Sequence, residues 1–136
     1  MKADLPDRPP VKDVHIAVAP RPGKTGEEEL WDIYLVNTGP ETLHNVLVTS
    51  QGYGTLDGRD KTTTVLRHFY DTIDPDSYIK VEPIQRVLFG ITNEYWVSFN
   101  RREHMLDKKY VFRPGDIGED RFERVPVLNR QGVLKS

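Results

Sequence analysis

Four histidines have the widest chemical use of any side chains here, because histidine serves as acid, base or metal ligand near neutral pH. His15, His44, His68 and His104 lie on separate segments, and no two have the i, i+2 spacing that places two ligands on one face of a strand. Two or three of them could still converge in the folded chain. The spacing itself favours solvated or hydrogen-bonded histidines, so we expect no metal site.

Two loops contain aspartates that could bind calcium. Asp71, Asp74 and Asp76 lie around one turn, and Asp57 and Asp60 lie around another. Carboxylates from both loops could meet at one end of a β-sandwich. The Asp-x-Asp-x-Asp-Gly order of calcium loops is missing, however, and turn formation explains each aspartate equally well. We expect turns, with calcium binding as the alternative.

The enzymatic motifs are incomplete. Gly23-Lys24-Thr25 ends like a phosphate-binding loop, but Val18 stands where the first glycine is needed and Glu27–Glu29 would repel phosphate. Ser50 lacks the Gly-x-Ser-x-Gly surroundings of a hydrolase nucleophile, and the chain has no cysteine to serve instead. We therefore expect a non-enzymatic interaction or structural module without a cofactor. An unrecognised enzyme or a ligand-binding domain is the alternative.

The clearest binding signal is an aromatic residue beside cations. In residues 94–100, alternation turns Tyr95, Val97 and Phe99 inward and Trp96 outward, next to residues 101–104. Tryptophan and arginine are enriched in interface hot spots. We therefore predict a partner-binding corner, extended by two residues of another strand. Its residues are Trp96, Arg101, Arg102, His104, His68 and Tyr70.

A second interpretation, which the spare apolar residues of the tail favour, buries Trp96. The C-terminal residues include Phe122 and Val125, whose apolar side chains need cover. If they fold over the strand that contains Trp96, this strand is buried on both faces and Trp96 belongs to the core.

Seven stretches of β-forming residues, separated by turn residues, must position these side chains. Three consecutive threonines, Thr62–Thr64, disfavour a helix in the fourth stretch. The segment between Val81 and Asn93 leaves room for one helical turn around residues 85–89. The expected strands are Val11–Ala19, Leu30–Asn37, Leu43–Gln51, Lys61–Tyr70, Tyr78–Ile84, Glu94–Asn100 and Met105–Phe112.

Alternation along these strands predicts one core between two sheets. Val65 and Phe112 are placed inward, although their strands also fit the opposite register. The expected core is Val14, Ile16, Val18, Trp31, Ile33, Leu35, Val46, Val48, Val65, Ile79, Val81, Tyr95, Val97, Phe99 and Phe112.

The composition fits one soluble domain, because 136 residues are too few for two well-packed cores. We expect a flexible segment at 1–10, a sandwich at 11–114, and an extended tail at 115–136 that packs on the sandwich.

The net charge of −2 argues against nucleic acid and anionic membranes as partners. We expect any partner to be a protein that the sequence does not identify, and the chain to be a monomer or a weak homodimer. Asp4 and Pro6 do not suit a signal peptide, so we expect a cytoplasmic protein.

Two resemblances add to this interpretation. Residues 35–46, with Asn37-Thr38-Gly39-Pro40, and the turn Asp74–Ser77 resemble the hairpins of immunoglobulin-like sandwiches. This resemblance covers about residues 11–113 and implies an antiparallel, all-β, immunoglobulin-like sandwich of about seven strands. The Cys-Trp-Cys core of antibody domains is absent, so only the architecture is implied.

The whole chain also resembles a family of short uncharacterised bacterial proteins, some of which carry a phenylalanyl-tRNA synthetase alpha-subunit name. The resemblance rests on residues 45–54, 65–69, 94–99 and 132–134. A class II synthetase core needs a large sheet and three separated motifs, and this chain is too short to hold them. Arg101-Arg102-Glu103 matches one Arg-x-Glu element, which is common by chance. We therefore do not expect aminoacylation.

Overall fold

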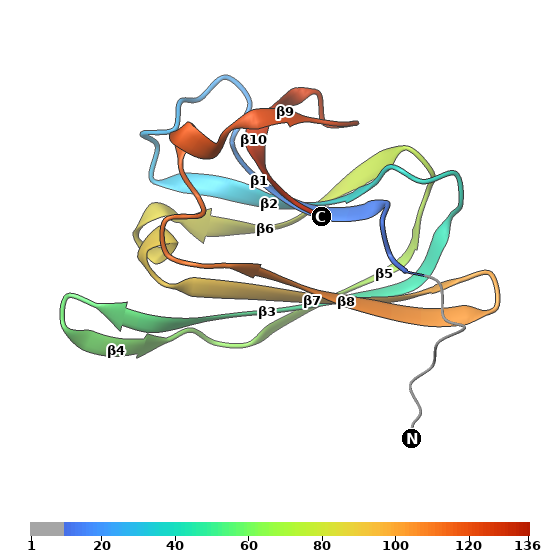
Figure 1. Cartoon of the computed structure of the whole chain (residues 1–136), viewed down its shortest axis with the longest axis horizontal. Coiled ribbons are helices and arrows are strands. Elements are labelled where there is room, and N and C mark those ends of the chain that lie inside the picture. Colours follow the sequence, from blue (N-terminus) through green and yellow to red (C-terminus); the bar gives the residue numbers. More distant parts are fainter. Residues whose placement is uncertain (1–9) are drawn as a thin grey trace.

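The structure is a computed structural model, and it describes residues 10–136. Our expectation for residues 1–10 lies outside this range, apart from Pro10. Two antiparallel sheets pack face to face (Figure 1), which confirms the expected all-β sandwich. The first sheet has the order β6 (Ser77–Gln85), β2 (Leu30–Asn37), β1 (Val14–Pro20), β10 (Arg130–Lys135) and β9 (Glu123–Val125).

The second sheet is built around the long strand β3 (Leu43–Leu56). On one side β3 pairs with β7 (Thr92–Arg101), which in turn pairs with β8 (His104–Phe112). On its other side β3 pairs with β5 (Leu66–Ile73) along its first half and with β4 (Arg59–Thr62) at its end. The short 3₁₀ helices η1 (Arg86–Gly90) and η2 (Glu119–Arg121) complete the described elements. Within residues 10–136, no helix has the length and apolar character to cross a membrane.

The core lies between the two sheets and contains the expected residues, with two exceptions. Phe112 is fully buried, as predicted. Ile79 is only partly buried and packs against the core. Val65 lies outside the strands and outside the core, so its placement was wrong.

A register shift explains the position of Val65. The expected strand Lys61–Tyr70 is divided into β4 and β5 by residues 63–65. Tyr53 pairs with Thr62, whereas Ser50 pairs with Leu66, so the edge strand has one extra residue between these pairs. An extra residue in one strand is a β-bulge, and it exchanges the faces of the side chains beyond it.

The C-terminal residues form part of the sandwich. Strand β10 pairs with β1, with Val133 opposite Val18, so residues 130–135 are a sheet strand where we expected a tail. The preceding residues lie over the outer face of the first sheet (Figure 1). There they close a second apolar cluster, which contains Ala17, Ala19, Tyr34, Val36, Val125 and Leu128. This cover explains why every residue of β1 is buried.

The same segment decides between the two interpretations of Trp96. Phe122 packs against Trp31, with 5.5 Å between ring centroids, and Val125 packs in the second apolar cluster. Neither residue covers Trp96, whose exposed fraction is 51%. The interpretation that placed Trp96 under the C-terminal residues was therefore wrong, because these residues lie on the opposite sheet.

Candidate functional site

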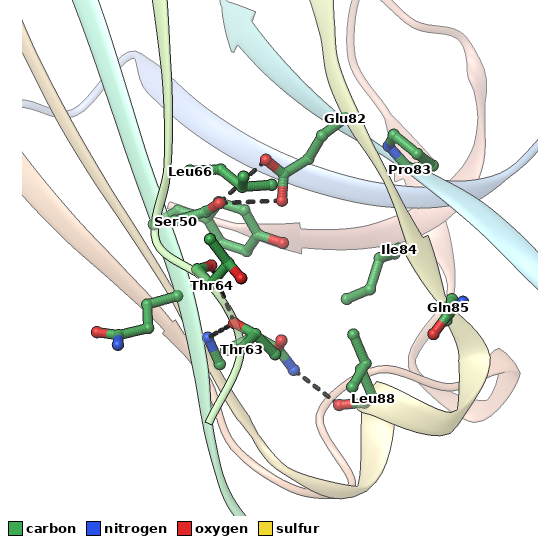
Figure 2. Close-up of a pocket in the computed structure, with 13 residues that line it drawn as sticks. Ser50, Thr63, Thr64, Leu66, Glu82, Pro83, Ile84, Gln85 and Leu88 are labelled. Atoms are coloured by element: carbon green, nitrogen blue, oxygen red, sulfur yellow. Dashed lines mark hydrogen bonds between the residues drawn. The ribbon is translucent and has the colours of Figure 1, made fainter. Parts of the chain in front are cut away.

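A cavity opens between the two sheets, where β5 and β6 leave an open edge. Figure 2 shows the residues that line it. The chain leaves β5, turns at residues 74–76 and enters β6 in the other sheet. Because β5 and β6 are not paired with each other, a hollow of about 240 Å³ remains beside them. Residues Ser50, Gln51, Gly52, Thr63, Thr64, Leu66, Glu82, Pro83, Ile84, Gln85, Leu88, Asn93 and Tyr95 line it.

A bulge turns Glu82 into this cavity. The pairing of β2 with β6 shifts register between Ile33 and Tyr34, and Val81 is the extra residue of β6. Val81 belongs to the core, and Glu82 pairs with the fully buried Ile33, so neighbouring residues of β6 both face inward. Bulges often re-aim a side chain in this way. Simple alternation from Ile79 and Val81 would place Glu82 in solvent, which is why the sequence analysis missed it.

Glu82 joins the two sheets through hydrogen bonds. The hydroxyl of Ser50, on β3, donates to both carboxylate oxygens at 3.0 and 3.1 Å. Nε2 of His68, on β5, lies 2.6 Å from Oε1 of the same carboxylate. Ser50 is 4% exposed and Glu82 is nearly buried, so both oxygens of the carboxylate are held in a defined position. Figure 2 shows Glu82 and Ser50 at one end of the cavity.

This order of residues differs from a hydrolase triad. In a triad, histidine stands between the nucleophile and the acid and takes the nucleophile's proton. Here Glu82 stands between Ser50 and His68. The arrangement therefore suits binding better than acyl transfer.

Tyr95 brings an unpartnered hydroxyl to the same cavity. Tyr95 lies opposite Ser50 in the pairing of β3 with β7 and is 2% exposed. No described residue forms a hydrogen bond with its hydroxyl. Burial, followed by the negative charge of Glu82, raises the pKa of Tyr95 well above its usual range. A neutral hydroxyl thus stands near the carboxylate without a protein partner.

At the other end of the cavity, the polar side chains form hydrogen bonds with the backbone and stabilise the fold. Asn93 Nδ2 donates to the carbonyl of Leu88 at 2.8 Å, which holds η1 against β7. Thr63 Oγ1 accepts a hydrogen bond from the amide of Gly52 at 2.7 Å. A Cβ atom at Gly52 would lie 2.9 Å from Asn93 Oδ1, so a larger residue here would displace the Asn93 amide. These contacts fix the position of Asn93 and Thr63 in the wall of the cavity.

The residues of the predicted corner do not come together. Trp96 lies on the outer face of the second sheet, in the middle of β7. His68 and Tyr70 pair with Val48 and Val46, which are buried, so they are on the inner side of β5. The corner therefore divides between two faces of one sheet, because side chains alternate along a strand.

Arg101 and Arg102 lie at the turn between β7 and β8, together with the exposed His104. Arg101 is 11% exposed, and its Nη1 lies 2.6 Å from Asp13 Oδ1. Glu41 lies 3.9 Å from Arg101 and also forms an ion pair with Arg102. Arg101 thus connects β7 to the residues before β1 and after β2. Its role is structural.

The aspartates proposed for calcium are far apart. Asp57 follows β3 at its C-terminal end, whereas Asp74 follows Ile73, which pairs with Leu43 at the other end of the same strand. Within residues 10–136, no three histidine, aspartate or glutamate side chains could hold a metal ion together. The structure thus gives no support for calcium binding at these loops.

Comparisons with protein families, curated proteins and solved structures give no match to this chain. The resemblance to the short bacterial family therefore stays a prediction. Arguments about function rest on the chain's own geometry.

An apolar patch on the outer face of the second sheet is the second candidate site. We define the outer patch as Leu47, Thr49, Phe69 and Trp96. Leu47 pairs with Phe69, and Thr49 pairs with Trp96, so these residues occupy two neighbouring rows of the sheet. Phe69 is 59% exposed, and no described residue covers the patch.

Proposed function

We propose that this chain is a non-enzymatic, cytoplasmic, protein-binding module whose partner covers the outer patch. One contrast carries the proposal. The outer face of the first sheet is covered by C-terminal residues such as Val125 and Leu128, whereas Phe69 and Trp96 on the second sheet are left in solvent. Large exposed aromatic side chains on one face of a sheet are typical of interaction surfaces.

Charged side chains beside the patch indicate what the partner presents. Arg67 and Lys109 flank Thr49 and Trp96 in one row of the sheet. Lys109 Nζ lies 5.7 Å from the centre of the Trp96 ring and 3.4 Å from Glu94. Arg67 is exposed and pairs with no described carboxylate. The surface therefore suits a protein segment with apolar side chains at its centre and a carboxylate at its edge.

The strand order supports an immunoglobulin-like origin of the module. The order β6-β2-β1 in one sheet and β5-β3-β7-β8 in the other follows the E-B-A and C′-C-F-G orders of immunoglobulin sandwiches. Such sandwiches present binding surfaces on rigid sheets and on the loops between strands. The fold alone does not specify a partner.

Affinity capture with matched variants tests this function. The purified chain is immobilised, the retained protein is identified, and its affinity is measured with the pure components. We expect the double variant Trp96→Ser, Phe69→Ser to weaken binding at least about tenfold. Val87→Ser, which removes an equally exposed apolar side chain from η1, is expected to leave affinity unchanged.

Two outcomes would contradict the proposal. One is that the double variant binds the retained protein as tightly as the parent. The other is that no protein is retained specifically by the parent chain.

A further inference from the structure

We propose that the cavity between β5 and β6 binds a small organic ammonium ion with an apolar body, held by Glu82 and Tyr95. This goes beyond the proposed protein-binding function and uses a different face of the molecule. The outer patch faces away from the core, whereas the cavity opens at the edge between the sheets.

The charge of the cavity selects a cation. Glu82 is the only charged residue among the described residues that line the hollow. His68 contacts its carboxylate from outside this lining and is a cation only when protonated. Ser50 and His68 direct hydrogen bonds to the carboxylate without filling all of its acceptor positions, since an ionised carboxylate accepts about four. An anion would be repelled here, whereas an ammonium group gains a charge-assisted hydrogen bond.

Tyr95 gives the second, independent indication. The Tyr95 side chain is buried, but its hydroxyl reaches the cavity and forms no hydrogen bond with any described residue. The hydroxyl is therefore available to a ligand, and the negative charge of Glu82 acts on it. Its oxygen accepts a hydrogen bond from the same ammonium group that binds the carboxylate. One ligand group therefore satisfies both protein groups.

The remaining wall selects an apolar body. Figure 2 shows Ile84 and Leu88 pointing into the hollow on the side away from Glu82. Leu66 lies at the edge and is partly exposed. A short alkyl chain would cover these side chains and remove them from water. The volume of about 240 Å³ limits the ligand to a small molecule.

Three matched probes test the ligand class. Pentylammonium, 1-pentanol and pentanoate share one alkyl chain and differ in the charge of their polar end. Each is titrated into the ¹⁵N-labelled chain, and amide shifts near Ser50, Glu82 and Leu88 are followed by NMR. We expect saturable amide shifts with pentylammonium and at least about tenfold weaker binding of 1-pentanol. Pentanoate is expected not to bind.

Variants test the residues. Glu82→Gln keeps one acceptor oxygen and the size of the side chain but removes its charge. We expect this variant to bind pentylammonium about tenfold more weakly or worse. Tyr95→Phe removes only the hydroxyl, and we expect a smaller loss of a few-fold. Glu94→Gln removes a carboxylate from the outer face of β7 and is expected to bind like the parent. A cooperative thermal unfolding transition well above the titration temperature verifies that each variant is folded.

The proposal is overturned if pentylammonium does not bind, if pentanol binds equally well, or if Glu82→Gln binds like the parent. These outcomes are separate from the failure of protein binding at the outer patch, because none of the probes or variants involves Trp96 or Phe69.

Discussion

Glu82 Oε1 and His68 Nε2 lie 2.6 Å apart, although their strands belong to different sheets and are not paired. Together with Ser50, this contact joins the sheets across an edge that the backbone leaves open. A polar connection of this kind is uncommon in a sandwich core, where apolar side chains usually fill the space. It lies at one end of the cavity that we propose as a ligand site.

Replacing Glu82 by alanine tests this connection. The change leaves Ser50 and His68 without their acceptor, and we expect the free energy of unfolding to fall by about 1–3 kcal/mol. Urea denaturation measures the change, and Glu94→Ala on the outer face is the control. A gain in stability would contradict this expectation and show that the carboxylate is retained at a cost in stability.

Replacing Trp96 by alanine tests its exposure. Because half of the side chain is in solvent, we expect a loss of less than about 1 kcal/mol. Trp31→Ala is the matched control, since Trp31 is buried between Phe89 and Phe122, and we expect it to cost about 3–5 kcal/mol. Thermal or urea unfolding compares the two variants. Similar losses in both would show that Trp96 is covered in solution.

Arg101 and Arg102 are adjacent and carry the same charge, yet we expect them to differ in effect. Arg101 is nearly buried and contacts Asp13 and Glu41, so Arg101→Ala should cost about 1–3 kcal/mol of unfolding free energy. Arg102 is mostly exposed, so Arg102→Ala should cost less than about 1 kcal/mol. Urea denaturation at low and high salt measures the unfolding free energy of both variants. Equal losses of unfolding free energy would refute the structural role assigned to Arg101.

His15 makes stability depend on pH. It is buried, with its ring nitrogens 2.8 Å from Ser136 Oγ and 3.0 Å from Thr38 Oγ1. Burial, followed by the positive charge of Lys108, lowers its pKa below the ordinary value of 6.5. As the pH falls through this value, the unfolded chain takes up a proton before the folded chain does, so stability is lost.

We therefore expect the free energy of unfolding to decrease between about pH 7 and 5, and His15→Gln to reduce this slope. Denaturation at several pH values measures it. His104→Gln, at an exposed turn position, serves as the control and should leave the slope unchanged. An equal slope in His15→Gln and the parent would exclude His15 as its source.

The local pattern of the sequence determined most of the strands and the core. Alternation with a period of two reports which face a side chain takes relative to its neighbours, and this sufficed for β1, β2 and β7. Tyr95 was placed inward and Trp96 outward for the same reason, and the structure confirms both. Turn residues such as Asn37–Pro40 likewise marked a chain reversal before β3.

The tertiary structure alone decided the candidate sites. Whether Trp96 is exposed depended on which sheet Phe122 would cover, and period-two alternation contains no information on contacts between distant segments.

Val65 and Glu82 both differ from alternation because a single extra residue in an edge strand exchanges the faces of the side chains beyond it. Pro83 beside Glu82 was the one local sign of such an irregularity, since proline is confined to edges and bulges of sheets. Ser50, His68 and Glu82 meet only because β3, β5 and β6 come from two sheets whose packing brings their open edges together, and that packing depends on the whole core.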